Sequence, residues 1–176
     1  MDNSHPKHLR LGAVALAAVA TLTLAAACTE ETPEPEPAGN PAAAAAEAGG
    51  PQPKTLDGAK AAAQIVFDRF SGGDFAGAWD MYTAAGKKAI SKDDYVKLNT
   101  ACSRKGLAIQ LTSARMEGAD KAVVIAKQLV AAQSYTMVYE QDAWKLEPAK
   151  EGLSLYKMGA TKAIAAQKKA GTCANS

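Results

Sequence analysis

Apolar residues in the middle of the chain recur every three or four positions, which is the period of an amphipathic helix. Such stripes run through residues 57–70, 74–86 and 91–102. Each segment opens on a residue type that caps helix N-termini well: Asp57, Asp74 and Ser91. The pattern therefore predicts three helices before any strand.

After Gly106 the apolar period changes to two, as expected for strands with one buried face. Strands are predicted in four segments: 107–116, 123–125, 135–140 and 143–147. Turn residues separate them, and Pro148 ends the last strand. A final helix is predicted over residues 161–170. Helices first and hairpins later indicate an α+β fold, with the N-terminal helices packed on one face of an antiparallel sheet.

A different pattern occupies the start of the chain. Seventeen uncharged residues, Leu11 to Ala27, follow a basic stretch and end at Cys28. This is the layout of a secretory signal peptide. The run is short and alanine-rich for a membrane-spanning helix, which needs about 20 apolar residues. An ordinary signal peptide with a chance cysteine at its end is a competing interpretation of Cys28.

The stretch Leu24-Ala25-Ala26-Ala27-Cys28 resembles the lipobox of bacterial lipoproteins. In that motif the cysteine thiol receives a diacylglyceryl group and cleavage follows just before it. Most such boxes have a larger aliphatic residue where this chain has Ala25. The resemblance implies loss of residues 1–27, a lipid on Cys28, and anchoring to the outer face of the cell membrane. Two acyl chains give stable anchoring where one does not.

Residues 28–56 have the composition of a tether. They hold five glutamates and six prolines and lack aromatic side chains, so they cannot bury enough surface to offset the entropy of ordering. We expect a disordered spacer, followed by one domain over residues 57–176. That domain carries 17 Lys and Arg against 12 Asp and Glu, scattered along its length. Export of the protein, and the absence of a cluster among these basic residues, argue against a nucleic-acid partner.

The three cysteines become an even set if Cys28 carries lipid. Cys102 and Cys173 then remain in an exported, oxidising setting, and we predict a disulfide between them. Two free buried thiols are the alternative, because sequence alone cannot provide their separation.

The order of elements is similar to that of NTF2-like domains. The resemblance rests on Gly73, Asp74, Phe75 and Trp79 after the first helix, and on the closing strand Trp144-Lys145-Leu146. Exported actinobacterial lipoproteins with this cone-shaped fold look much like this chain. The resemblance covers residues 57–148 and implies a curved sheet wrapped around a helix, with a pocket at the mouth of the cone. A C-terminal helical extension falls outside it.

The predicted mature chain has no histidine, because His5 and His8 both leave with the signal peptide. This excludes Ser-His-Asp and Cys-His catalysis and removes the commonest zinc ligand. No phosphate-binding or calcium-binding motif occurs, and we expect no metal, no cofactor and no catalytic residue. The candidate pocket residues are four tyrosines, which pair an apolar ring with a polar tip, and one carboxylate: Tyr82, Tyr95, Tyr135, Tyr139 and Glu140.

These observations favour a lipid-anchored protein whose domain binds without catalysis. The partner is either a small apolar ligand or a cell-envelope protein, and a dimer is left open. One alternative is an isomerase or dehydratase that uses a carboxylate base and a tyrosine donor, as steroid isomerases of the NTF2-like class do. Another is an accessory module of the cell-wall machinery with no pocket ligand.

Replacing the proposed lipid acceptor tests the anchoring. We expect Cys28→Ser to release the protein from the membrane fraction or to leave an unprocessed precursor, because serine cannot form the thioether. Cell fractionation and mass spectrometry of the N-terminus provide the measurement. A wild-type protein secreted with a free Cys28 thiol would contradict the prediction.

Overall fold

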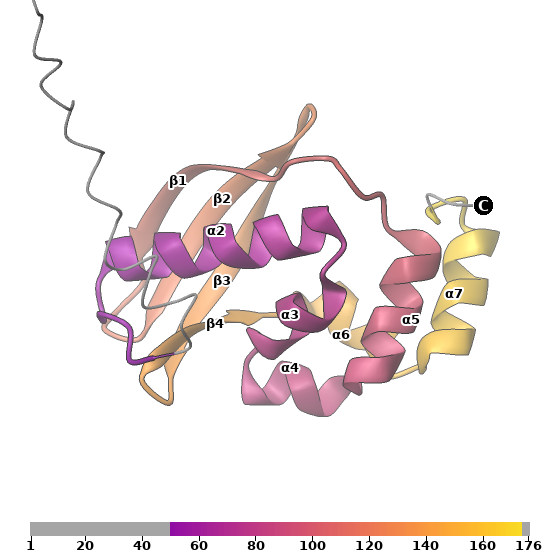
Figure 1. Ribbon diagram of the computed structural model, residues 1–176, viewed down its shortest axis with the longest axis horizontal. Coiled ribbons are helices and arrows are strands. Elements are labelled where there is room, and N and C mark those ends of the chain that lie inside the picture. The colour runs from indigo at the N-terminus through magenta and orange to yellow at the C-terminus, as the bar shows by residue number, and fades with distance from the viewer. Residues whose placement is uncertain (1–49, 174–176) are drawn as a thin grey trace, which may run out of the picture. The chain divides into compact units, whose positions relative to one another are not determined.

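A computed structural model describes residues 50–173 of this chain, so residues 1–49, including the predicted signal peptide and Cys28, lie outside the described residues. The described part is an α+β domain of helices and one four-stranded antiparallel sheet (Figure 1). The helices are α2 (Leu56–Gly72), α3 (Phe75–Asp80), α4 (Ala84–Ala89), α5 (Lys92–Cys102), α6 (Lys150–Tyr156) and α7 (Ala160–Lys169). The strands are β1 (Gln110–Met116), β2 (Lys121–Gln128), β3 (Ala131–Glu140) and β4 (Ala143–Glu147).

The first helix begins two residues earlier than its sequence pattern suggests. Thr55 is the N-cap of α2 and its side chain accepts the N–H of Gly58, so Asp57 lies inside the first turn instead of capping it. There its negative charge still faces the positive end of the helix dipole. Gly73 ends the helix in a left-handed conformation, with φ of 87°, and donates its N–H to the carbonyl of Phe70.

The helix predicted over residues 74–86 is two helices in the structure, α3 and α4. Contact with the sheet causes the break between them. Asp74 caps α3 as expected, but the chain leaves the helix at Met81–Thr83. These residues lie beside β4: the N–H of Leu146 donates to the carbonyl of Met81, and Thr83 donates to the carbonyl of Leu146. Pairing with a strand requires extended backbone, so one helix cannot run through this point. The third predicted helix is confirmed as α5, capped by Ser91.

The four strands form a meander in the order β1-β2-β3-β4. Tight turns connect β2 to β3 and β3 to β4, the latter through Gln141 and Asp142, whose φ values of 53° and 58° suit a two-residue hairpin. The strand predicted from residue 107 begins at Gln110. Before this strand, side-chain amides of Gln64 and Gln128 donate to the carbonyls of Ile109 and Leu107.

The core lies between α2 and the sheet, and Figure 1 shows α2 running across the strands. The ring of Phe67 on α2 contacts that of Tyr135 on β3, with 4.8 Å between centroids. Val124 lies directly opposite Tyr135, and Met137 lies opposite Leu146, so these side chains share the face that α2 covers. The helices therefore cover one face of an antiparallel sheet, as predicted.

Residues that we expected in the tether already belong to the folded domain. The N–H of Gln52 donates to the carbonyl of Asp142, and its side-chain oxygen accepts the N–H of Trp144. Trp144 is fully buried, and its indole N–H donates to the carbonyl of Pro53 at 3.0 Å. A buried indole needs such a partner. The folded part therefore begins near residue 52 and not at residue 57.

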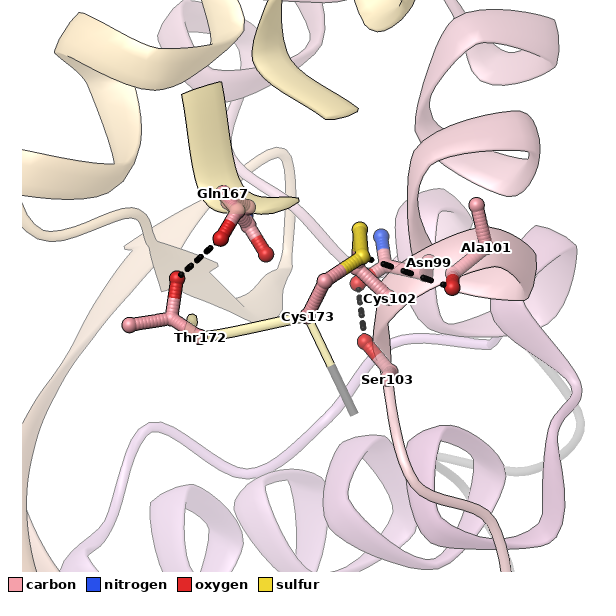
Figure 2. The surroundings of a disulfide bond; sticks show 7 residues. All are labelled: Asn99, Ala101, Cys102, Ser103, Gln167, Thr172 and Cys173. Atoms are coloured by element: carbon pink, nitrogen blue, oxygen red, sulfur yellow. Dashed lines mark hydrogen bonds between the residues drawn. A yellow bond between two sulfur atoms is a disulfide. The ribbon is translucent and has the colours of Figure 1, made fainter. Parts of the chain in front are cut away.

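The predicted final helix is confirmed as α7, and a disulfide joins its end to α5 (Figure 2). Cys102 and Cys173 are 71 residues apart in sequence, and their Cα atoms are 4.2 Å apart. The prediction of this bond is confirmed. Because disulfides are rare in the reducing cytosol, the bond indicates an extracytoplasmic location. The helix α6, which precedes α7, was not predicted.

Removal of the disulfide should destabilise the domain. The chain-entropy model gives about 4 kcal/mol for a loop of this length. We therefore expect Cys102→Ala with Cys173→Ala to unfold at a markedly lower denaturant concentration than the oxidised wild type. Intact mass before and after reduction should differ by about two hydrogens in the wild type alone. Unchanged unfolding midpoints, or two alkylatable thiols in the native protein, would contradict this.

Candidate functional site

An inner cavity of about 180 Å³ lies between α2, α5, α6 and the sheet. Its walls are mostly aromatic and aliphatic, and among the described residues that line it none is a carboxylate or a lysine. The lining residues are Val66, Phe67, Phe70, Tyr82, Tyr95, Asn99, Ile109, Tyr135, Leu146 and Tyr156. The cavity is therefore an apolar space whose polar groups are phenol hydroxyls and one amide.

Three tyrosine hydroxyls form a chain at this cavity. The Tyr82 hydroxyl lies 3.0 Å from that of Tyr95 and 3.4 Å from that of Tyr156. Three phenols carry three hydrogens, and two hydroxyl–hydroxyl contacts use two of them. One hydrogen is left over, whichever way the chain is oriented. The cluster thus offers one donor to an acceptor on a ligand, because an unpaired buried donor is costly.

These tyrosines come from three separate elements. Tyr82 follows α3, Tyr95 lies on α5, and Tyr156 ends α6. Their rings pack edge to face, with centroids of Tyr82 and Tyr95 at 5.2 Å and of Tyr95 and Tyr156 at 5.9 Å. Edge-to-face contacts match the electropositive edge of one ring with the electronegative face of the next. The packing fixes where the hydroxyls point.

Burial keeps the phenols protonated. It is the largest cause that raises the pKa of Tyr82, Tyr95 and Tyr156, and the negative charge that a neighbouring tyrosinate would carry raises each further. Burial also raises the pKa of Tyr135. At neutral pH these side chains are therefore hydrogen-bonding groups without charge, and none of them can act as a base.

An outer groove of about 980 Å³ adjoins the inner cavity, since Tyr82, Tyr135, Leu146 and Tyr156 line both. One wall is β3 from Gln133 to Thr136 and the other is α6 from Lys150 to Leu153. Its remaining lining residues are Lys121, Glu147, Pro148 and Ala149. The groove is polar, carries charges of both signs, and leads into the apolar inner cavity.

Of the predicted tyrosines, Tyr82, Tyr95 and Tyr135 line the inner cavity, and Tyr139 lines neither space. Its ring contacts that of Trp144 at 5.3 Å, and its hydroxyl donates to the carbonyl of Gln52 at 2.7 Å. Tyr139 therefore holds the start of the domain against β4.

Glu140 also lines neither space. Its carboxylate accepts the N–H of Ala84 at 2.6 Å, at the start of α4. A carboxylate there satisfies one of the free N–H groups of the helix terminus. Burial and the charge of Lys87 lower the pKa of nearby Lys145, and the charges of Glu140 and Asp80 partly offset this.

Among the polar residues of the cavity, sequence reasoning missed Tyr156 and Asn99. Tyr156 lies on α6, beyond residues 57–148, and Gly152 and Pro148 obscure the helical period there. Tyr156 lies three residues after Leu153, and this helical spacing was the available signal in the sequence. Asn99 lies on α5 and its amide donates to the carbonyl of Tyr95 within the helix. A polar residue on an otherwise apolar helix stripe is a signal of this kind.

Within residues 50–173 no group of three or more His, Cys, Asp and Glu side chains is arranged to hold a metal ion. In the same part of the chain, every helix is too short or too polar to span a bilayer. Comparison with protein-family models, with curated proteins and with solved structures found no match to this chain. Inferences about function therefore rest on the cavity itself.

The buried phenols predict a loss of stability in alkali. A tyrosine whose pKa is raised by folding stabilises the native state fully below its unfolded pKa of about 10, and that contribution is lost as pH rises above 10. Each buried phenol should lower the free energy of unfolding by about 1.4 kcal/mol per pH unit in that range. Tyr82, Tyr95 and Tyr156 should ionise together with unfolding.

Absorbance of tyrosinate and far-ultraviolet circular dichroism, followed together from pH 9 upward, provide the measurement. The variant Tyr156→Phe serves as the control, because it should ionise one tyrosine fewer in the unfolding step. Ionisation of all five tyrosines well before the loss of secondary structure would contradict the prediction.

Proposed function

We propose that this protein is a lipid-anchored, extracytoplasmic binding protein whose domain holds a ligand without transforming it. The ligand places an apolar group in the inner cavity and a hydrogen-bond acceptor against the tyrosine hydroxyls. The observation that carries the proposal is the chain of three phenols from Tyr95 through Tyr82 to Tyr156, which leaves one hydrogen to donate. A mostly apolar pocket with a few convergent polar groups is the usual form of a ligand site.

The proposal includes the anchoring that the lipobox resemblance implies, with Cys28 as the attachment point. The disulfide supports an oxidising compartment. The NTF2-like resemblance also belongs to the proposal, and an α+β domain with a pocket beside a helix-covered sheet supports it. In this setting the domain would meet its ligand in the cell envelope.

The charge distribution favours binding over catalysis. A carboxylate base of the steroid-isomerase type works inside a dry cavity beside its tyrosine donor. The described residues that line the inner cavity include tyrosines but no carboxylate. Glu147 and Glu151 line the outer groove as exposed side chains, and Glu140 is held at the start of α4. The site thus offers hydrogen-bond donors and apolar surface, which are the features that a ligand-binding site requires.

A tryptophan placed in the groove tests the proposal. A Cβ on Gly152 would meet the ring of Tyr156 at 3.9 Å, which is ordinary contact, so the substitution Gly152→Trp fills the groove at little cost to the fold. Replacing a helical glycine also favours the helix. We expect Gly152→Trp to weaken binding of 8-anilinonaphthalene-1-sulfonate by about tenfold or more. This fluorescent probe is an anion with apolar aromatic rings and acceptor oxygens on its sulfonate.

The matched control is Gly72→Trp, at the end of α2, where an added Cβ meets no atom within 4 Å. It adds the same indole outside the groove and should leave probe affinity unchanged within about twofold. Equal affinities in the two variants, or a probe that does not bind the wild type at all, would count against the proposed function.

A further inference from the structure

We propose that the outer groove binds an extended peptide segment of a partner protein, which adds to the sheet as a strand beside β3. The inference rests on the proposed function in one respect, because the groove opens into the same tyrosine-lined cavity. It names the class of ligand: a peptide strand with one apolar side chain that enters the cavity.

The two sides of β3 are paired to different extents. Along one side, every residue from Ala131 to Val138 has a partner on β2. Along the other side, β4 pairs with Thr136 to Glu140 and goes no further. Pro148 follows β4 and cannot continue the ladder. Five residues of β3, from Ala131 to Tyr135, therefore have a free edge of about 16 Å.

The register shows which backbone groups face that edge. Residues opposite each other in an antiparallel pair alternate between pairs that exchange both hydrogen bonds and pairs that exchange none. The two-residue turn makes Glu140 and Ala143 a bonded pair, so Thr136 is bonded to β4 as well. Ala132 and Ser134 continue this alternation. Their N–H and C=O groups point to the free edge and have no partner among the described residues, and Ser134 lines the groove.

This edge lacks the protection that edge strands usually carry. Natural sheets guard their edges with charges, prolines, bulges or covering segments. The edge of β1 has a register irregularity between Leu111 and Ser113, and the far edge of β4 is covered by residues 81–83. The free edge of β3 carries only small or neutral residues: Ala131, Ala132, Gln133, Ser134 and Tyr135. An unguarded edge is a template for strand addition.

The shape of the groove favours a single strand over a second copy of this chain. Helix α6 forms the opposite wall of this groove of about 980 Å³, and we expect a single added strand to fit there more readily than a second sheet. Lysines and glutamates both line the groove, so their charges favour neither a cationic nor an anionic ligand. This suits the uncharged main chain of a peptide. At the tip of the β2–β3 hairpin, next to the edge, Leu129 and Val130 are 66% and 93% exposed. Exposed apolar residues beside an open edge extend the surface that a partner would cover.

A phage-displayed library of random ten-residue peptides, selected on the chain from residue 28 onward with Cys28→Ser, provides the probe. The most enriched peptide is then synthesised and titrated against three variants. Ser134→Pro removes an N–H that points into the groove, at a position where an edge strand tolerates proline. Ala114→Pro is the matched control, since its N–H points outward from β1 at the other edge of the sheet. Gly152→Trp fills the groove, and circular dichroism checks that all three are folded.

We expect Ser134→Pro to weaken the peptide about tenfold or more and Ala114→Pro to change it less than about twofold. Hydrogen exchange should show fast Ala132 and Ser134 amides that become protected when peptide binds. If Gly152→Trp blocks the peptide but Ser134→Pro does not, strand addition is wrong and the groove remains a binding site. If neither substitution weakens the peptide, the proposed function fails as well.

Two further outcomes overturn the inference. An absence of enriched peptides would mean that the edge does not accept a strand. Slow exchange at Ser134 before any peptide is added would mean that another segment of the chain or a second copy already pairs with β3. Sedimentation would distinguish these two occupants, because pairing between copies depends on concentration.

Discussion

The disulfide bond restrains one wall of the candidate site. The helices on that side, α6 and α7, bury little area of their own. Helix α6 has no fully buried residue, and the buried residues of α7 are two alanines, Ala160 and Ala163. Such small contacts offset little of the entropy lost when two helices are fixed. The disulfide from Cys102 to Cys173 ties the end of α7 to α5 and so restrains the helix pair. Because α6 carries Tyr156 and walls the groove, the site depends on this bond.

The same arrangement links location to function. A disulfide persists outside the cytosol, where a lipid-anchored domain would stand. In a reducing compartment, α7 would be held to α5 only by packing and by contacts such as the hydrogen bond from Lys97 to Thr161. Oxidised cysteines therefore add a covalent restraint to the packing that keeps α7, and with it α6, beside the pocket. This relation joins the proposed anchoring at Cys28 to the geometry of the cavity.

In the binding that we propose, the inner cavity and the outer groove perform complementary parts of recognition. Buried phenols are rigid and uncharged at neutral pH, so they select for an acceptor of defined position without demanding a charge. In this proposal, the backbone edge at Ala132 and Ser134 recognises any extended chain, whatever its side chains. Specificity would then come from the side chain that reaches the cavity. This division is typical of peptide-binding sheets, where main-chain bonds supply affinity and pockets supply selectivity.

The sequence by itself predicted most of the local elements and favoured the pairing of the two cysteines, whose proximity only the structure shows. Apolar periods of about 3.6 and 2, with Asp74, Ser91 and Pro148 as boundaries, predicted most helices and strands, because these signals act over a few residues. Tertiary structure decided the rest. Strand pairing at Met81–Thr83 divided a predicted helix, and neighbours distant in sequence turned Tyr139 toward Gln52 and Glu140 toward α4. A period shows which face a residue occupies but not which distant segment covers it, so the hydroxyl chain and the open edge of β3 emerged only with packing.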